Sequence, residues 1–410
     1  MSLPSLTTAR PRNCGKLTAL FLCAALVFLA TGCWDCTEIE NCLFATLLGV
    51  DYAANEGYTL ALTLPMLSED ENAGADIKKA YGRSLPEALK ELDTQSGKKI
   101  CLGQVKVMVF GENLLNHPTA MDHAAEFLNA HPDIDRLALV LAAEDVCKIL
   151  ESRPPDERLP GIYIGEFFKD GKKSAGQTFR LDFEQLYTVL WESGNVLLPA
   201  VSVDDEGLKI EGAYAVKASA HADNGTMGLE AINTDKPTSE SDSTSSTRYA
   251  LDKTELRGLL WTQDKGCPGS VLMRKDNAAP SLTVERHDAK WIFSEENGRL
   301  RGEVRVRVSG TAATEEEQHE NHRENRQASS RKAIISTDEK EKSESALAKI
   351  ITEEINATAE KMQTELRMDG YAARQRLRKT NYPLYLKYAK DWDCVFSDME
   401  MVPVVTVSIK

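Results

Sequence analysis

Cys33 is the residue of this chain whose type and surroundings predict the most definite chemistry. It follows Ala30-Thr31-Gly32, and such small side chains let a signal peptidase hold the backbone in an extended form at the scissile bond. A cysteine directly after these residues is typical of a lipobox, in which the thiol receives a diacylglycerol before the signal is removed. Ala30 stands where leucine is usual. We expect cleavage before Cys33 and a covalent lipid, with acyl chains such as palmitate, on its sulfur.

The segment before Cys33 has the composition of a secretory signal. Arg10, Arg12 and Lys16 give it a positively charged start, and the apolar run 17–30 follows without a charged residue. A membrane-spanning helix needs about 20 apolar residues, so this shorter run favours a cleaved signal, residues 1–32, over an uncleaved anchor. A buried helix of a cytosolic protein would show a polar face, and none is present in 20–30.

Two other spacings suggest chemistry, but each has a simpler explanation. Cys33 and Cys36 have the spacing of a redox pair, yet lipidation would consume the first thiol and no thioredoxin-like strand and helix pattern precedes it. His319 and His322 lie three residues apart in a charged segment, whereas a zinc helix spaces its histidines by four. The sequence also has no phosphate-binding glycine loop, nucleophile elbow or dinucleotide fingerprint. We therefore expect no enzyme activity, no metal site and no cofactor besides the lipid on Cys33.

The charge of the chain excludes one class of partner. Lys and Arg number 49 against 63 Asp and Glu, and removal of the three basic residues of the signal leaves a net charge of −17. Such a chain repels phosphate backbones, and no basic stripe with interleaved aromatic residues favours nucleic acid. The sequence also shows no polybasic patch for anionic lipid. Membrane attachment is therefore expected to depend on the acyl chains, of which two hold stably and one only marginally.

The cysteines do not form a dense disulfide framework. Six remain after the signal and Cys33 are set aside, and they are scattered over about 380 residues. Cys36 and Cys42 are close enough in sequence to form a disulfide near the membrane. The other four are expected to be isolated small buried residues.

The chain up to residue 205 alternates strand and helix patterns. The first expected element is a strand from Tyr58, with Leu47–Val50 as its hairpin partner. The next is a helix over Ser84–Leu92, in which Ser84 is the N-cap and Glu87 completes a capping box. The remaining expected elements are strands at Val105–Phe110, Leu137–Leu141 and Pro199–Val203, and helices at Pro118–Ala130 and Asp182–Glu192; a strand at Lys209–Val216 then follows beyond residue 205. This alternation predicts a mixed α/β or α+β domain over 33–205, which is either a single domain or divided into two subdomains.

The sequence pattern of the second half, 206–410, predicts a sheet covered by one long helix. Its expected strands are Leu282–Glu285, Lys290–Ser294, Glu303–Ser309 and Val404–Ile409. Apolar residues then recur at three- and four-residue steps through Glu339–Asp369, which predicts an amphipathic helix closed by Gly370. Asn233–Arg248 lacks large apolar side chains and predicts a mobile loop. We expect an α+β protein of several domains, with mixed and antiparallel sheets, flanking helices and a long amphipathic helix on a C-terminal sheet.

Several of these segments, in their order along the chain, resemble one known family. The opening motif is Gly32-Cys33-Trp34-Asp35 followed by Glu38-Ile39. The later motifs are Leu48-Gly49-Val50-Asp51 with Gly57-Tyr58, Gly82-Arg83-Ser84 with Glu87-Ala88, Leu102-Gly103-Gln104-Val105-Lys106-Val107, Glu211–Lys217, Asp369-Gly370-Tyr371, Pro383, Trp392 and Val405–Ile409. Together they are similar to the Ger(x)C spore-germination lipoproteins, the C subunits of nutrient germinant receptors. Gln104 stands where many members carry histidine, and Cys36 and Cys42 are unusual for the family, which again raises a local disulfide.

The resemblance implies a non-enzymatic subunit with several α+β domains, held by its lipid on the outer face of the spore inner membrane. Its implied partners are two integral-membrane subunits, of A and B type, in a complex that responds to small nutrients. It implies Cys33 as the lipid site and Trp34, Asp35, Glu38 and Ile39 as a signature around it.

One rival hypothesis shares the signal and the mixed fold. A lipid-anchored solute-binding protein of a transporter would have two similar α/β lobes hinged around a ligand cleft. The expected order of the second half, several strands and then one long helix, does not fit a second such lobe. A surface hydrolase is a third hypothesis, for which the sequence offers no catalytic motif.

Overall fold

The computed structural model describes residues 21–22, 39–65, 75–154, 159–169, 178–193, 195–217, 249–263, 271–272, 281–313 and 337–410. The chain divides into two compact units, 1–42 and 43–410. The short 3-10 helix η1 (Ile39–Asn41) belongs to the first. The expected loop Asn233–Arg248 and the pair His319 and His322 lie outside the described residues.

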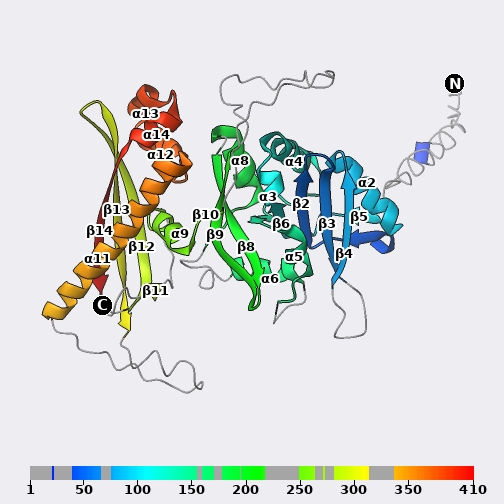
Figure 1. Cartoon of the computed structure of the whole chain (residues 1–410), viewed down its shortest axis with the longest axis horizontal. Coiled ribbons are helices and arrows are strands. Elements are labelled where there is room, and N and C mark those ends of the chain that lie inside the picture. The colour runs from blue at the N-terminus through cyan, green and yellow to red at the C-terminus, as the bar shows by residue number, and fades with distance from the viewer. Residues whose placement is uncertain are drawn as a thin grey trace, which may run out of the picture. The chain divides into compact units, whose positions relative to one another are not determined.

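The larger sheet of the second unit has eight strands in the order β10-β9-β8-β7-β6-β2-β3-β4 (Figure 1). Its four central strands are mutually parallel: β2 (Leu47–Ala53), β6 (Val107–Gly111), β7 (Leu139–Ala143) and β8 (Asn195–Asp204). Antiparallel strands extend both sides: β3 (Gly57–Pro65), β4 (Ala75–Gly82), β9 (Gly207–Lys217) and β10 (Tyr249–Leu251). The expected hairpin of Leu47–Val50 with the Tyr58 strand is confirmed by the β2–β3 pairing.

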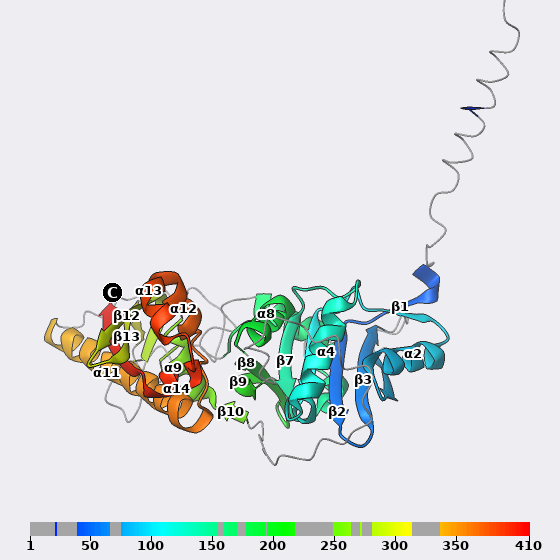
Figure 2. The ribbon, with the colours of Figure 1, turned by 90° about the horizontal axis from the view of Figure 1, so that it is seen from above.

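Helices cover both faces of this sheet. One face packs against α2 (Leu85–Ser96), α4 (Pro118–Ala130) and α8 (Phe183–Ser193), which follow one another along the sheet in Figure 2. The other packs against α5 (Val146–Glu151) and α6 (Pro160–Lys169). Helix α3 (Glu112–Leu115) connects β6 to α4, and the short strands β1 (Cys42–Phe44) and β5 (Lys99–Cys101) form a separate two-stranded sheet. Because both faces are covered, β6 and β7 at the centre are buried along their whole length.

Helix α2 begins where the sequence predicts. The Ser84 hydroxyl accepts a hydrogen bond from the backbone N–H of Glu87 at 3.4 Å. The Glu87 carboxylate accepts from the N–H of Arg83 at 2.9 Å, one residue earlier than in a standard capping box. Gly97 closes the helix in the left-handed conformation, with φ of 61°.

The predicted domain boundary between residues 205 and 206 falls in the turn of the β8–β9 hairpin. The two strands pair from Asp204 and Gly207 back to Asn195 and Lys217. The sheet therefore continues past this position and ends only with β10.

The second sheet corrects one expectation about its strands. It has the order β11-β12-β13-β14, with β11 (Val271–Leu272), β12 (Ser281–Glu296), β13 (Arg299–Ala313) and β14 (Glu400–Ile409). The sequence predicts separate strands at Leu282–Glu285 and Lys290–Ser294, which was wrong because both belong to the single strand β12. A bulge between Val284 and Arg286 shifts the register and interrupts the two-residue alternation from which strands are predicted.

One face of the second sheet is buried under a long helix, as expected. Val304, Val306 and Val308 are buried while Arg305 and Arg307 are exposed. Helix α11 (Thr337–Glu360) runs along β14 and buries Leu347, Ile351 and Ile355 in the same core (Figure 1). Full burial of each isoleucine stabilises the fold by about 2 kcal/mol before the entropy of ordering is counted.

The expected end of this helix at Gly370 was wrong. The helix passes into one turn of π-helix, η2 (Lys361–Leu366), and stops at Arg367, whose φ is 48°. Gly370 instead lies against the ends of two side chains: a Cβ there would be 2.7 Å from Met362 Cε and 2.8 Å from Leu197 Cδ1, so these side chains would have to move.

Strand β14 is an edge strand whose outer side is poorly able to pair with a further strand. The N–H of Lys410 bonds to Gly310 O on β13, whereas the N–H of Ile409 points to the other side and bonds to Glu344 at 2.8 Å. Pro403 lies an even number of residues from Ile409, on that same outer side, and has no N–H to offer. A proline at this position opposes pairing with a further strand.

Four short helices of the second half were not predicted. They are α9 (Lys253–Leu260), α12 (Ala373–Thr380), α13 (Tyr382–Tyr388) and α14 (Trp392–Asp398). With α11 they complete the helical cover of the second sheet, so the fold is α+β with mixed and antiparallel sheets, as expected.

Candidate functional site

The residues predicted around the lipid site lie mostly outside the described part of the chain. Cys33, Trp34, Asp35, Cys36 and Glu38 are all among the residues not described. Ile39 opens η1 and is 77% exposed. Cys42 opens β1 and is half-buried, and its pairing with Cys36 stays a prediction. Lipid attachment at Cys33 likewise stays a prediction.

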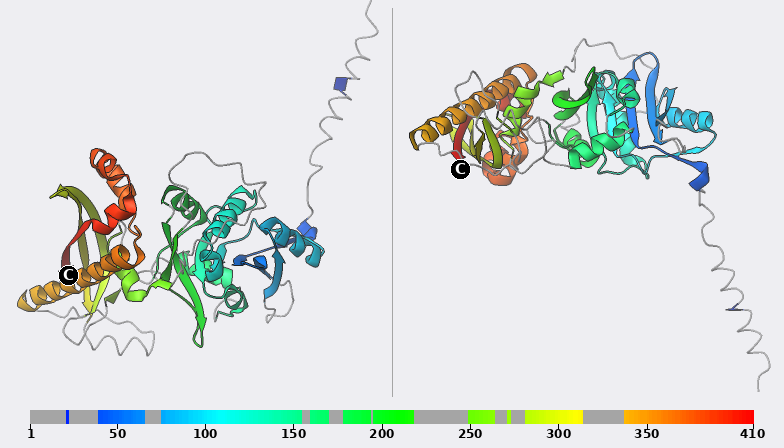
Figure 3. Two further views of the ribbon diagram at one scale, coloured as in Figure 1. Left: turned by 45° about the horizontal axis from the view of Figure 1, so that its top comes forward. Right: turned by 90° about the horizontal axis from the view of Figure 1, so that it is seen from below.

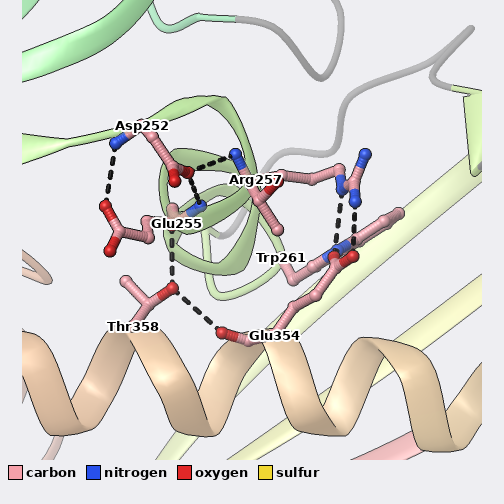
Figure 4. Close-up of polar contacts among 7 residues, drawn as sticks. Asp252, Glu255, Arg257, Trp261, Glu354 and Thr358 are labelled. Carbon is pink, nitrogen blue, oxygen red and sulfur yellow. Dashed lines mark hydrogen bonds and ion pairs between the residues drawn. The ribbon is translucent and has the colours of Figure 1, made fainter.

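The best-defined polar cluster lies between α9 and α11, and we call it the α9–α11 cluster (Figure 4). It consists of Asp252, Glu255, Arg257, Gly258, Trp261, Glu354, Thr358 and Lys361. Asp252 begins α9 with a full capping box: its carboxylate accepts from the N–H groups of Thr254 and Glu255, at 2.7 and 2.8 Å. The Glu255 carboxylate accepts in return from the N–H of Asp252 at 2.8 Å. The start of α9 is thereby fixed directly after β10.

A half-buried ion pair joins α9 to the middle of α11. Arg257 donates to the Glu354 carboxylate through Nε at 3.0 Å and through Nη2 at 2.5 Å. The Nε1 of Trp261 donates to the same carboxylate at 3.0 Å. The two charged side chains are only 17% and 10% exposed. A pair this shielded from water is costly to break, because loss of one partner leaves the other charge buried and unpaired.

Two further contacts bring the helices together one turn later. The Thr358 hydroxyl lies 2.8 Å from the carbonyl oxygen of Glu255 and 2.9 Å from that of Glu354, and its single hydrogen can be donated to either. Lys361 Nζ bonds to both carboxylate oxygens of Glu255 at 2.8 Å. At Gly258 the helices approach so closely that a Cβ would overlap the Thr358 hydroxyl and the Glu354 carbonyl. The cluster therefore couples the strand that ends the larger sheet to the long helix of the second sheet.

A second polar cluster organises the turn after η2, and two of the family-like motifs meet in it. The Asp369 carboxylate accepts from the N–H of Tyr371 at 3.1 Å, of Ala373 at 2.9 Å and of Arg374 at 2.9 Å. It also accepts from Trp392 Nε1 at 3.1 Å. Burial raises the pKa of Asp369, and the four N–H donors oppose that rise. One carboxylate thus fixes the start of α12 and docks α14 onto it.

His287 contacts the α9–α11 cluster, and its buried imidazole should make the stability of the protein depend on pH. Its Nε2 contacts the carbonyl of Trp261 at 2.9 Å, which assigns the proton to Nε2, and its Nδ1 has no hydrogen-bond partner among the described residues. Burial lowers the pKa of His287, so the unfolded chain binds the extra proton more readily than the folded one. We expect the free energy of unfolding to fall on acidification from about pH 7 to pH 5. Urea unfolding at both pH values should show that the free energy of unfolding falls less in His287→Gln than in the wild type, and falls as much as in the wild type in the exposed-site control His123→Gln. If the free energy of unfolding of His287→Gln fell as much as that of the wild type, His287 would not be the source of the pH dependence.

A polar cavity opens at the carboxyl ends of the parallel strands β2, β6 and β7. It has a volume of about 480 Å³ and is lined by β2, β3, β4, helix α3, and the segment from the end of β7 into the first turn of α5. Asp51 at its edge is already engaged by the N–H groups of Tyr52 and Leu114, at 2.9 and 3.1 Å. Burial and the neighbouring carboxylates of Glu144 and Asp51 raise the pKa of Glu112. The described part of the chain holds no group of three or more His, Cys, Asp or Glu side chains suited to a metal ion.

Local sequence patterns could indicate only some of the residues in these clusters. Asp252 with Glu255 has the spacing of a capping box and was readable before the structure. The partners Arg257 and Glu354 are 97 residues apart, and no local pattern connects them. Asp369 and Trp392 were noted as family-like residues, without a role. In the described residues, no helix has both the length and the apolar character needed to cross a bilayer.

Two family models match the chain in order. Residues 35–203 match the spore germination protein N-terminal domain, and residues 247–410 match the spore germination B3/GerAC-like C-terminal domain. The first match begins two residues after Cys33, and together the matches cover most of the chain.

Individual proteins and one solved structure agree with these models. Spore germination protein KC of Bacillus subtilis (strain 168) is 22% identical over 324 residues, which cover 73% of this chain and 74% of that protein. Spore germination protein B3 of the same organism is 20% identical over 403 residues, 95% of each chain. The crystal structure of the GerBC protein superposes with a TM-score of 0.54 at 16% identity, over 88% of this chain and 96% of that one. At this identity the superposition shows a shared fold.

Proposed function

The chain belongs to the GerAC family of spore germination proteins, and from this membership we propose that it is the lipid-anchored, non-enzymatic C-type subunit of a nutrient germinant receptor. The observation that carries the proposal is the order of the matches: the N-terminal family domain follows directly on the predicted lipobox at Cys33, and the C-terminal family domain comes after it. A diacylglycerol on Cys33 would hold the protein on the outer face of the spore inner membrane. Integral-membrane subunits of A and B type would be its partners there.

The arrangement of the described elements supports an assembly role. The α9–α11 cluster and the Asp369 cluster consist largely of partly buried, mutually hydrogen-bonded groups that fix helices against one another. Such groups stiffen a scaffold, and they leave no nucleophile paired with an oriented base. A rigid body held at a membrane by a flexible lipid is suited to presenting surfaces to partners.

The rival hypothesis of a solute-binding protein fits the fold less well. It requires two similar α/β lobes around a ligand cleft. Here the larger sheet has eight strands with helices on both faces, whereas the second has four strands, one of its faces covered by α11. The two sheets are therefore not a repeated lobe.

Deletion of the gene tests the proposal. We expect spores of the deletion strain to lose germination in response to the nutrient or nutrients that this receptor senses, and to regain it when the wild-type gene is restored. Germination by agents that bypass nutrient receptors serves as the control for intact spores. Normal nutrient germination combined with lost uptake of one solute would favour the solute-binding hypothesis and contradict the proposal.

A further inference from the structure

A basic segment interrupts the otherwise acidic chain at α12 and α13. Between Ala372 and Lys390 there are six Lys or Arg residues and no Asp or Glu. Three of the six are used within the fold: Arg374 donates to the carbonyl of Ala389, Arg376 donates to that of Tyr371, and Lys387 pairs with Glu295 at 2.6 Å. The remaining three are exposed, and the described residues offer them no ion-pair partner: Arg378, Lys379 and Lys390. These three exposed basic side chains are a local exception to the acidic composition of the chain.

Helix α13 adds exposed apolar side chains to these charges. It has no buried residue, and Tyr382 and Leu386, one helical turn apart, are 55% and 60% exposed. Tyr382 stacks on Tyr385 with ring centroids 5.9 Å apart, which holds the ring in place. Helix α13 therefore presents two large apolar side chains to the outside, on a segment that also carries exposed basic side chains.

The opposite side of α13 is attached to the rest of the domain. The Tyr388 hydroxyl donates to the carbonyl of Gly298 at 3.1 Å, in the turn of the β12–β13 hairpin, and Lys387 reaches Glu295 on the same hairpin. In the left view of Figure 3 the orange and red helices of this segment lie beside that end of the hairpin. Because α13 is fixed through Lys387 and Tyr388, the face that carries Tyr382 and Leu386 is left outward.

We propose that this surface, formed by Arg378, Lys379, Tyr382, Leu386 and Lys390 and called the α13 surface below, rests on a membrane that contains anionic lipid. Basic side chains gain binding free energy near anionic headgroups, and tyrosine with leucine suits the boundary between headgroups and acyl chains. The rest of the protein is acidic and would be repelled, so the α13 surface would choose the face that meets the membrane. The proposal deepens the proposed function, since it rests on a membrane-anchored chain, and it adds a second, electrostatic contact.

Amide hydrogen exchange on vesicles tests the proposal with the full chain. The protein is reconstituted through its own anchor into phosphatidylcholine vesicles, with or without phosphatidylglycerol, and exchange of residues 378–390 is followed by mass spectrometry. We expect exchange to slow at least about fivefold in the anionic vesicles alone, since each basic residue near an anionic surface contributes about that factor. High ionic strength should remove the effect.

Two triple variants separate the α13 surface from general charge. Arg378→Gln, Lys379→Gln and Lys390→Gln together should abolish the slowing, whereas Lys90→Gln, Lys98→Gln and Lys349→Gln, which remove the same charge from exposed positions elsewhere, should retain it. Equal exchange on both kinds of vesicle would overturn the proposal. So would exchange in the free protein, before any vesicle is added, that is already as slow as on the anionic vesicles, because the surface would then be covered by another part of this chain. Binding of the protein to pure phosphatidylcholine vesicles depends on the lipid anchor alone. A protein without a working anchor would not bind these vesicles, whereas a protein whose α13 surface does not contact lipid would bind them and show no slowing on anionic vesicles.

Discussion

Asp369→Asn should lower the free energy of unfolding by about 3 kcal/mol although it removes no atom from the core. All four groups that contact the carboxylate are N–H donors, from Tyr371, Ala373, Arg374 and Trp392. An asparagine has one acceptor oxygen, and its amide nitrogen would face two of these donors in either orientation. Urea unfolding of the two proteins measures the difference.

Asp398→Asn is the matched control for this prediction. It makes the same change at an exposed position of α14, where an effect within about 0.5 kcal/mol is expected. If Asp369→Asn were as stable as this control, the carboxylate would not be the group that organises the turn. The result would then favour a protonated Asp369, for which an amide is a close substitute.

Gly258→Ala should be at least as damaging, by about 3 kcal/mol, because its added methyl group has nowhere to go. The Cβ would overlap the Thr358 hydroxyl and the backbone carbonyl of Glu354. The carbonyl belongs to the middle of α11 and cannot rotate away, so the helices must separate. Separation would stretch the Arg257–Glu354 pair and the Trp261 hydrogen bond as well.

Gly165→Ala provides the control, since it makes the same change in helix α6 with no atom within 4 Å of the new Cβ. Alanine is the better helix former, so this variant should be neutral or gain up to about 1 kcal/mol. Thermal unfolding of both variants measures the contrast. Equal stability of Gly258→Ala and Gly165→Ala would mean that α9 and α11 do not pack closely.

The longer elements of the first half could be predicted from local patterns because they are strongly apolar, whereas the helices α3, α5 and α6 were not predicted. Helix α4 has the predicted bounds, Pro118–Ala130, and the Ser84 cap of α2 was visible as a spacing of polar residues. Strand β4 was missed, since Lys78 and Lys79 on an edge strand hide the alternation.

The second half was harder because tertiary contacts, and not local periodicity, define its short helices. Arg367, Ala372 and Asp391 adopt positive φ values, between 48° and 54°, without being glycine, and no sequence rule marks them as turns. Asp369 and its long-range partner Trp392 hold these turns. Where a single buried group fixes several backbone segments, its neighbours in sequence carry little information.

The candidate sites follow the same division. The predicted lipid site at Cys33 depends on a local motif, which a sequence can show completely. The α9–α11 cluster joins residues about a hundred positions apart, and the α13 surface depends on which basic side chains the fold has already paired. Overall net charge obscured that surface, because six basic residues in one segment are averaged away in an acidic chain.

The most direct measurement of the central claim is nutrient-triggered germination in a deletion strain that expresses either the wild-type protein or Cys33→Ala. We expect the wild-type protein to restore germination, and we expect Cys33→Ala, which cannot carry the diacylglycerol, to leave it lost. Cys394→Ala, at an exposed thiol on α14, should restore it as the wild type does. Full germination with Cys33→Ala, at equal protein level, would contradict the claim that a lipid on this residue places the subunit where it acts.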